Sequence, residues 1–317
     1  EENNMKKILL VLVTMLFIFS CGSKDQAAGK TEDKPAETGE KTYTIGVSLL
    51  TQQHPFYLSL KDAIEKEAAA QNVKLNVSIA NQDLNKQISD IEDFITKKVD
   101  AIIISPVDSK GVLAAVKKAE AANIPVITVD VPAIGVDVAA HVATDNYTGG
   151  KIAGEEMARL LNGKGEVAVI EYPTVDSVVQ RIEGFKEVIA KYPDIKIVAV
   201  QAGITRPEAL TAAQNMIQAN KNLGGIFGFG DDAALAAVAA VKSAGKEDQI
   251  KVIGFDGMQK ARDAVTKEKS FAAVITQYPE DMGKIAVDTT LKILKGEQVE
   301  KNIPVTPGIF TKEGEKK

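Results

Sequence analysis

The sequence predicts an α/β protein with two similar lobes, each built on a parallel sheet. Residues 100–130 run strand, helix, strand, with apolar stretches at 101–104 and 126–129 on either side of a helical pattern. Residues 225–256 repeat this design. Both strand pairs are continuously hydrophobic, which is typical of a parallel sheet covered on both faces. At 317 residues the chain is long enough for two domains.

The first lobe begins with the strand at residues 43–50, and Pro55 opens the helix that follows it. Proline suits the first helical position, where its missing N–H is no loss. A second helix follows through Ile88, Ile91 and Phe94. The other strands expected in this lobe are residues 73–79, 101–104, 126–129 and 140–143.

The second lobe continues the same alternation. Its expected strands are residues 166–170, 195–201, 225–229, 251–255 and 271–276. Its expected helices are residues 150–161, 178–190, 207–218, 233–244 and 259–267. A long amphipathic helix follows Gln277, and we expect it to return to the first lobe.

The N-terminal segment carries an export signal. Met5, Lys6 and Lys7 precede an apolar run at residues 8–19, which is too short and wrongly flanked for a transmembrane helix. The run ends in Ser20-Cys21-Gly22, which resembles a bacterial lipobox, so we expect residues 1–21 to be a lipoprotein signal peptide and Cys21 to be lipidated. A plain secretory peptide and a buried apolar strand are the alternatives.

Residues 22–42 are polar and charged without apolar periodicity, so they cannot bury enough surface to order themselves. We expect a flexible tether that spans roughly 25 Å and holds the protein near a membrane through the lipid anchor only.

Composition and motifs exclude several function classes. The net charge of −5 offers no electrostatic footprint for nucleic acid. One cysteine and two histidines make a disulfide framework and a zinc site improbable, so we expect no metal. The glycines at 149–154 lack the dinucleotide spacing, and the chain has no phosphate-binding loop and no G-x-S-x-G motif. We therefore expect neither a cofactor nor an enzyme, and we interpret these glycines as helix-start and packing residues.

Polar and aromatic residues gather just beyond strand ends, at the edge where open parallel sheets bind ligands. Aromatic rings can pack on the C–H faces of a sugar, and ionised acids form strong hydrogen bonds with its hydroxyls. The alternatives are core packing for the aromatic residues and helix N-capping for the two aspartates. The residues are His54, Phe56, Tyr57, Ser105, Asp130 and Asp256.

Seven segments along residues 43–312, in one order and spacing, resemble the ribose-binding branch of periplasmic sugar-binding proteins: SLLTQQHPFYLSLKDAIEKEA, IIISPVDSKGV, NIPVITVD, HVATDNYTGGKIAGE, RIEGF, VIGFDG and VITQYP. The resemblance implies two Rossmann-like lobes joined by three crossover strands, near Thr144, Gln277 and Pro307. The first lobe would comprise 43–144 with 278–306, and the second 145–277 with 307–313.

The resemblance also implies a function. The lobes would close over one monosaccharide or polyol, and the protein, as a monomer, would deliver it to the permease of an ABC importer. The family's ligand contacts fall on His54, Phe56, Tyr57, Ser105, Asp130, Val131, Arg181, Gly230, Asp256 and Gln277.

Several of these positions depart from the family pattern. His54, Ser105 and Gly230 replace the usual asparagines, and Val131 replaces an arginine; near Ile204-Thr205 a second-lobe aromatic is missing. These changes predict a roomier site with fewer donors, which prefers a larger sugar, a ketose or a linear polyol to ribose.

Rival functions remain open. A ligand sensor that docks on a chemoreceptor would share the fold. An exported enzyme is a further rival, but the sequence supplies no catalytic constellation. A transcription repressor of related fold would need an N-terminal helix-turn-helix, and an export signal occupies that place.

Overall fold

The computed structural model describes residues 42–316, and these contain two β-sheets with helices on both faces of each. The predicted signal peptide at 1–21, with Cys21, and residues 22–41 of the predicted tether lie outside the described residues. Within the described part of the chain, no helix is long and apolar enough to cross a membrane. The predicted two-lobed α/β class is confirmed.

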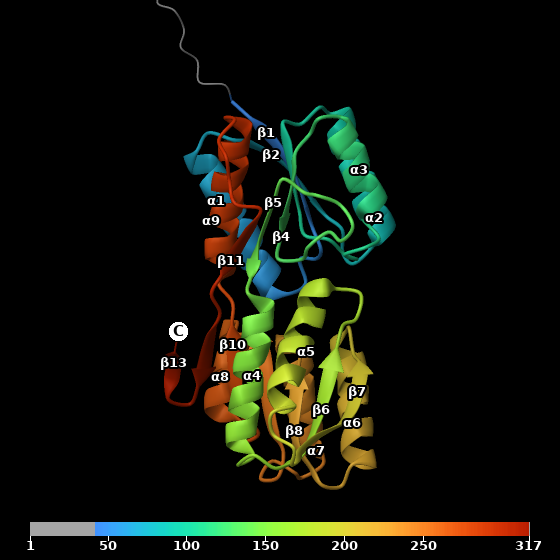
Figure 1. Cartoon of the computed structure of the whole chain (residues 1–317), viewed down its shortest axis with the longest axis vertical. Coiled ribbons are helices and arrows are strands. Elements are labelled where there is room, and N and C mark those ends of the chain that lie inside the picture. The colour runs from blue at the N-terminus through green and yellow to red at the C-terminus, as the bar shows by residue number, and fades with distance from the viewer. Residues whose placement is uncertain (1–41, 317) are drawn as a thin grey trace, which may run out of the picture. The chain divides into compact units, whose positions relative to one another are not determined.

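The first lobe is built on a six-stranded sheet in which all pairings are parallel, in the order β11-β5-β4-β3-β1-β2. Helices α1 and α9 pack together beside the sheet, and α2 packs with α3 (Figure 1). The strands are β1 (Thr44–Leu49), β2 (Lys74–Ile79), β3 (Ala101–Ile104), β4 (Val126–Val129), β5 (Ala140–Thr144) and β11 (Asn302–Val305). The helices are α1 (Pro55–Ala70), α2 (Leu84–Thr96), α3 (Leu113–Ala121) and α9 (Pro279–Leu294).

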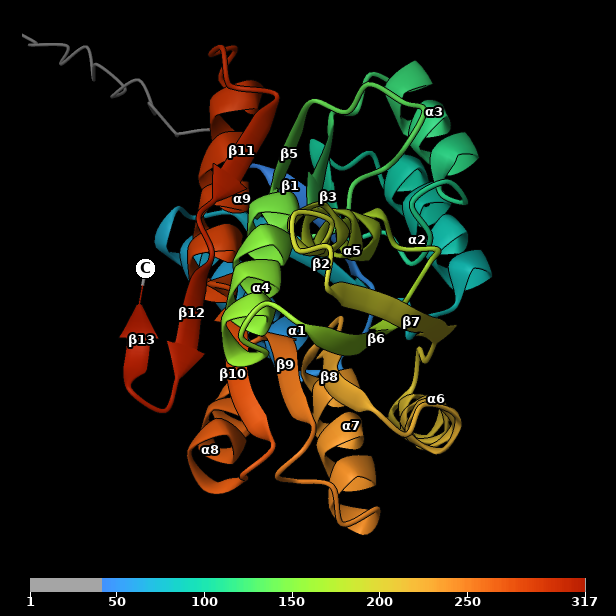
Figure 2. The same cartoon turned by 60° about the horizontal axis from the view of Figure 1, so that its bottom comes forward.

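The second lobe is built on a seven-stranded sheet in the order β13-β12-β10-β9-β8-β6-β7. Helix α4 packs with α5, and α6 packs with α7 (Figure 2). The strands are β6 (Gly165–Glu171), β7 (Ile195–Ala202), β8 (Leu223–Gly228), β9 (Lys251–Asp256), β10 (Phe271–Thr276), β12 (Gly308–Thr311) and β13 (Gly314–Lys316). The helices are α4 (Asn146–Leu160), α5 (Asp176–Ile189), α6 (Arg206–Ala219), α7 (Asp231–Ser243) and α8 (Gln259–Lys267).

The sequence predicts a parallel second sheet, but two of its strand pairings are antiparallel. Strand β12 pairs antiparallel with β10, and β13 pairs antiparallel with β12. The polar Gly-Glu-Lys of β13 has no hydrophobic signature, so this hairpin at the edge of the sheet gave no sign in the sequence.

The chain passes between the sheets three times: from β5 to α4, from β10 to α9 and from β11 to β12. Helix α9 packs on α1, and a Cβ at Gly283 would lie 2.7 Å from that of Ala63. The lobe boundaries expected at residues 144–145, 277–278 and 306–307 stay a prediction.

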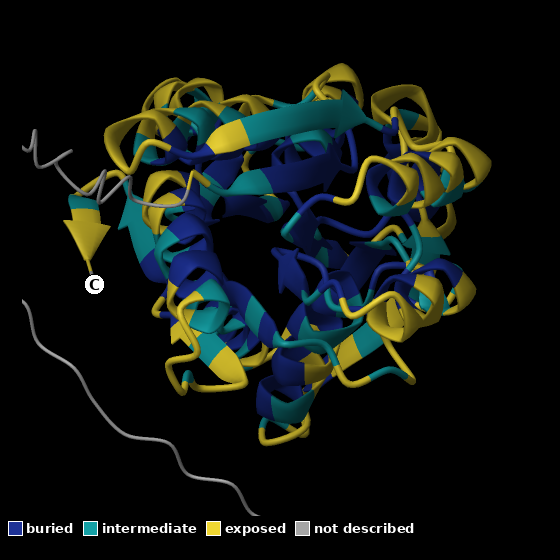
Figure 3. Ribbon diagram, turned by 90° about the horizontal axis from the view of Figure 1, so that it is seen from above, coloured by how far each residue is buried: buried dark blue, intermediate teal, exposed yellow. Residues whose placement is uncertain are grey.

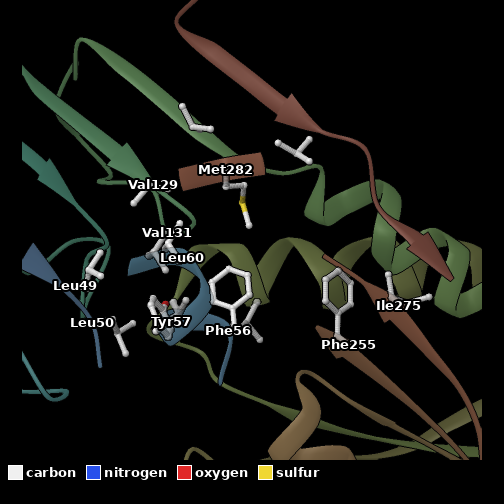
Figure 4. Packing of buried hydrophobic residues seen from close by; sticks show 14 of the residues in the cluster. Leu49, Leu50, Phe56, Tyr57, Leu60, Val129, Val131, Phe255, Ile275 and Met282 are labelled. Carbon is white, nitrogen blue, oxygen red and sulfur yellow. The ribbon is translucent and has the colours of Figure 1, made fainter. Parts of the chain in front are cut away.

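The interior is continuous across the two lobes. One cluster of buried side chains includes Leu49 and Phe56 of the first lobe and Phe255 and Ile275 of the second, with Met282 of α9 among them (Figure 4). The buried residues lie inside, and the exposed ones on the outer helices and loops (Figure 3). Each fully buried aliphatic or aromatic side chain contributes about 1.5–3 kcal/mol to the stability of the folded state. Because the cluster contains residues of both lobes, its burial also stabilises the contact between them.

Close packing of α4 on α5 explains the glycines at 149–154. Helix α4 begins at Asn146, before the predicted residue 150, because Asp145 caps it by accepting a hydrogen bond from the Thr148 N–H at 3.0 Å. A Cβ at Gly150 would collide with the carbonyl oxygen of Arg181. Gly150 and Gly154 therefore let α5 approach α4 closely, and Gly149 leaves room for the Phe255 ring, which is a packing role as expected.

Candidate ligand-binding site

A cavity of about 330 Å³ lies at the carboxyl ends of the strands, with residues of both lobes in its wall. This volume falls within the usual range for small-molecule sites. The predicted residues in its wall are His54, Phe56, Tyr57, Asp130, Val131, Arg181, Gly230, Asp256 and Gln277. Ser105 is fully buried and is not part of the wall, so the cavity does not expose it for the direct ligand contact that the sequence predicts.

His54 begins helix α1 and faces the second lobe. Its Nδ1 accepts a hydrogen bond from the Phe56 N–H at 3.2 Å, which makes it the N-cap of the helix. Because Nδ1 accepts, the proton of the neutral ring lies on Nε2. That atom is 3.5 Å from Oδ2 of Asp256, so His54 presents a donor to the opposite lobe.

Phe56 and Tyr57 belong to both the core and the cavity wall. Their rings meet edge to face with centroids 5.2 Å apart. The Tyr57 hydroxyl donates to Oδ2 of Asp130 at 2.6 Å and lies 3.3 Å from Oγ of Ser105. Ser105 thus supports the tyrosine from the side away from the cavity; both rings pack in the core, and their contact with a sugar stays a prediction.

Asp130 follows β4 directly and has a φ of 65°, in the left-handed region. Its side chain is buried, and no described residue donates a hydrogen bond to its Oδ1. Burial raises the pKa of Asp130 to about 6, although the charge of Arg181 opposes this rise. N-capping is excluded, because no helix begins after it.

Asp256 ends β9 and also has a positive φ, of 92°. Its Oδ1 accepts from Gln277 Nε2 at 2.7 Å and from Arg181 Nη1 at 3.3 Å. Its Oδ2 accepts from the Asp231 N–H at 3.2 Å. Asp256 does not cap the helix that follows it, because α8 has Met258 as its N-cap, but its bond with the Asp231 N–H satisfies the first residue of α7.

Arg181 is held by several partners on the second lobe. Its Nε donates to Oδ1 of Asn146 at 2.8 Å, and Nη1 donates to the carbonyl oxygen of Phe229 at 2.8 Å. The guanidinium lies 3.9 Å from the centre of the Phe255 ring, a favourable cation–π arrangement. Since α5 is also packed closely on α4, Arg181 is fixed before any ligand arrives.

Gly230 and Val131 shape the free space. A Cβ at Gly230 would lie 3.0 Å from Oδ2 of Asp256, so the glycine keeps that carboxylate uncrowded. Val131 is buried and lies with Leu60 and Val129 on the first-lobe side (Figure 4), where it makes an apolar wall.

Sequence reasoning missed two aromatic residues of the second lobe. Tyr172 and Phe229 line the cavity, with ring centroids 5.9 Å apart in an edge-to-face contact. They follow β6 and β8, so the strand-end pattern that gave Asp130 and Asp256 could have found them. The cavity therefore has aromatic residues on the second lobe although Ile204-Thr205 supplies none.

Asp231 was also missed, and it supports Asp256. It is buried, and its carboxylate accepts from the N–H groups of Gly257 at 3.2 Å and Met258 at 2.8 Å. Burial and the neighbouring charge of Asp256 raise its pKa well above the usual value. His54, Asp231 and Asp256 bring three possible metal ligands within 4.8 Å. Because both carboxylates already accept hydrogen bonds, we describe the group as a hydrogen-bond network.

The remaining wall residues include both buried and exposed side chains. Arg206 and Asp232 form a half-exposed ion pair at 3.8 Å. The other residues of the wall are Leu50, Thr51, Gln53, Gln82, Val175, Ser177, Val178, Ile204, Thr205 and Pro207.

Two α/β lobes around a cavity that contains buried carboxylates define a solute-binding protein of the type I periplasmic fold. The family described as periplasmic binding protein domain matches residues 45–298. The chain belongs to this family, in its ribose-binding-protein-like branch, whose members bind solutes and are not enzymes.

Individual relatives support this placement. The ribose import binding protein RbsB of Bacillus subtilis is 36% identical over 303 residues, covering 94% of this chain and 97% of the relative. The xylitol-binding protein of Mycolicibacterium smegmatis is 31% identical over 253 residues, covering 79% and 69%. A crystal structure of an ABC transporter solute-binding protein from Actinobacillus succinogenes with bound D-allose is 33% identical, with a TM-score of 0.80 and coverage of 86% and 98%.

Proposed function

We propose that this chain is the substrate-binding protein of an ABC importer and binds a monosaccharide or related polyol between its lobes. The observation that carries the proposal is the pair of buried acids, Asp130 and Asp256, which line one cavity from two different sheets. Relatives named for ribose import and for xylitol binding add support.

The polar groups of the cavity match a polyol. Oδ1 of Asp130 and Oε1 of Gln277 are buried acceptors with no donor among the described residues, so a ligand hydroxyl can donate to each. Hydrogen bonds to charged groups contribute about 1.5–3 kcal/mol each. Phe56 and Tyr172 offer ring surfaces to the C–H faces of the ligand.

The ligand differs from ribose in size or shape. Val131 supplies no donors where a relative's arginine would, and Gly230 leaves space beside Asp256. A larger sugar, a ketose or a linear polyol uses this space, whereas a pentose leaves buried polar groups unmatched.

The protein acts as an exported monomer anchored through lipidated Cys21, and it passes its ligand to the importer's permease. Replacing Cys21 by serine releases the protein from the membrane fraction, and loss of labelling by a clickable palmitate analogue accompanies the release. Equal membrane association of the variant would overturn the anchor.

A thermal-shift screen of pentoses, hexoses, ketoses and linear polyols tests the binding function. A ligand at 100 times its Kd stabilises the folded state by about 2.7 kcal/mol, which is readily detected. Absence of any shift at millimolar concentration across the panel would contradict the proposal.

A further inference from the structure

The N-terminal end of α5 receives part of its capping from the opposite lobe. Its N-cap residue is Val175, whose side chain has no hydrogen-bonding group. The first N–H groups of any helix have no partner within the helix and need acceptors from elsewhere. The N–H of Asp176, the first residue of α5, donates to Oγ of Ser109 at 3.1 Å.

Ser109 lies in the loop after β3 and so belongs to the first lobe, whereas α5 belongs to the second. A second bond joins the same two segments, because the Ser109 N–H donates to the carbonyl oxygen of Thr174 at 3.3 Å. Ser109 is only 3% exposed. It does not line the cavity, so these contacts across the cleft do not depend on touching a ligand.

The loop that carries Ser109 is held rigidly within its own lobe. Oδ1 of Asp108 accepts from the N–H groups of Lys110 at 2.9 Å and Gly111 at 2.7 Å. The buried amide of Gln87 binds the main chain on both sides of Pro106, at the carbonyl of Ser105 and the N–H of Val107. These bonds hold the loop and the Ser109 hydroxyl in position before α5 reaches them. Little conformational entropy is therefore lost when the hydrogen bond to α5 forms.

We infer that Ser109 is a positioning residue that favours lobe closure by capping α5, the helix that carries Arg181. The inference rests on the proposed function, in which the lobes close over a ligand. When the lobes separate, water replaces the serine at the helix end. A side-chain cap contributes typically about 1 kcal/mol, which corresponds to about a fivefold change in affinity.

The test compares full-length wild type, Ser109→Ala and a matched control, Ser89→Ala, whose serine is exposed on α2. D-Allose, xylitol, myo-inositol and D-ribose are the probes, with binding followed by calorimetry and stopped-flow fluorescence. We expect Ser109→Ala to bind each accepted probe about fivefold more weakly, mainly through faster dissociation. Ser89→Ala should bind as wild type does.

Amide hydrogen exchange at Asp176 in the probe-bound protein supplies a second readout, because the bond to Ser109 exists only while the lobes are closed. We expect the Asp176 amide to exchange severalfold faster in Ser109→Ala, while amides in the middle of α5 keep their protection. Failure of the wild type to bind any probe would count against the proposed function, whereas probe binding with unchanged exchange at Asp176 would count against the role of Ser109 alone. Unchanged exchange at Asp176, or unchanged dissociation from a bound probe, would overturn the inference.

Discussion

Asp130 and Asp256 occupy matching places in the two lobes, but their surroundings differ. Both lie at the carboxyl end of a buried strand, and both have a positive φ, 65° and 92°. Asp256 accepts hydrogen bonds from Arg181, Gln277 and the Asp231 main chain. Asp130 accepts a side-chain hydrogen bond from the Tyr57 hydroxyl, and its Oδ1 has no donor among the described residues.

In the proposed complex, this difference would give the two carboxylates different roles in binding. The second-lobe carboxylate is already compensated by fixed donors, so it is held in place as a charged acceptor. The first-lobe carboxylate is buried with little compensation, which is why its pKa rises to about 6. Ligand hydroxyls would supply what Asp130 lacks. Backbone strain at such positions is commonly stored at functional sites.

The largest loss of ligand affinity is expected from substitutions at Asp256 and at its partner Arg181. Asp256→Ala and Arg181→Ala each leave buried polar partners unmatched, and each should weaken polyol binding by about 2–4 kcal/mol. Calorimetry on folded variants measures this loss. Arg159→Ala, at an exposed arginine, is the control. Wild-type affinity in folded Asp256→Ala would remove that residue from the site.

A smaller change in affinity is expected from pH, through the carboxyl group of Asp130. In the proposed complex, ligand hydroxyls donate to the ionised form of Asp130, so binding should release a proton near pH 6, the pKa that burial gives this carboxyl. Affinity should be constant above that pH and fall by up to tenfold per unit below it. Titrations in buffers of different ionisation enthalpy count the released proton. No release between pH 5 and pH 7 would show that Asp130 does not contact the ligand.

Val131→Arg sharpens the comparison, because it gives Asp130 the charged partner that Asp256 already has. Five donors and a positive charge would be added to the first-lobe wall. We expect the affinity for ribose relative to xylitol to rise about tenfold, or 1.4 kcal/mol, and the pH midpoint of binding to fall. A panel titration at pH 5.5 and 7.5 measures both. An unchanged ribose-to-xylitol ratio would show that Val131 does not set specificity.

The smallest effect is expected at Gly230. An alanine Cβ would lie 3.0 Å from Oδ2 of Asp256, a tight contact that the carboxylate must accommodate. We expect a loss of about 1 kcal/mol for the largest bound polyol and less for the smallest. Competition calorimetry compares them. Equal losses for every ligand would point to a shifted Asp256 rather than to lost space.

Much of the fold was accessible from the sequence because the signals were local. Continuous apolar runs such as residues 101–104 are strongly biased toward buried strands, and their alternation with helices identifies the class. The start of α4 was misplaced because the glycines at 149–150 suggested a boundary, whereas Asp145 provides the cap. The β13 strand has no apolar residue to reveal it.

The site was accessible only in part. Residues that directly follow strands, such as Asp130, were found because parallel strands end at one edge. The role of Ser109 depends on which loop faces which helix once two lobes meet, and residues 67 positions apart give no local sign of that. The support that Asp231 gives to Asp256 is likewise a long-range contact, between β9 and the start of α7.

Asp130→Asn, measured by urea unfolding with and without a bound polyol, tests the central claim most directly. The pKa of Asp130 is about 6 in the folded protein, against 3.8 for an ordinary aspartate. The folded state therefore loses stability as the pH rises from about 4 to about 6, and it does not regain this stability at higher pH. At pH 7.5 this costs about 3 kcal/mol. Asp62→Asn, at an exposed carboxylate, controls for the loss of charge.

Without ligand, Asp130→Asn should be more stable than wild type at pH 7.5, by about 1–3 kcal/mol since the amide matches Tyr57 less well, and the two should converge near pH 4. With the tightest polyol of the panel at saturation for wild type, the order should reverse, because the variant lacks the negative charge that strengthens hydrogen bonds from ligand hydroxyls. A variant that is less stable without ligand, or equally stabilised by it, would contradict the account.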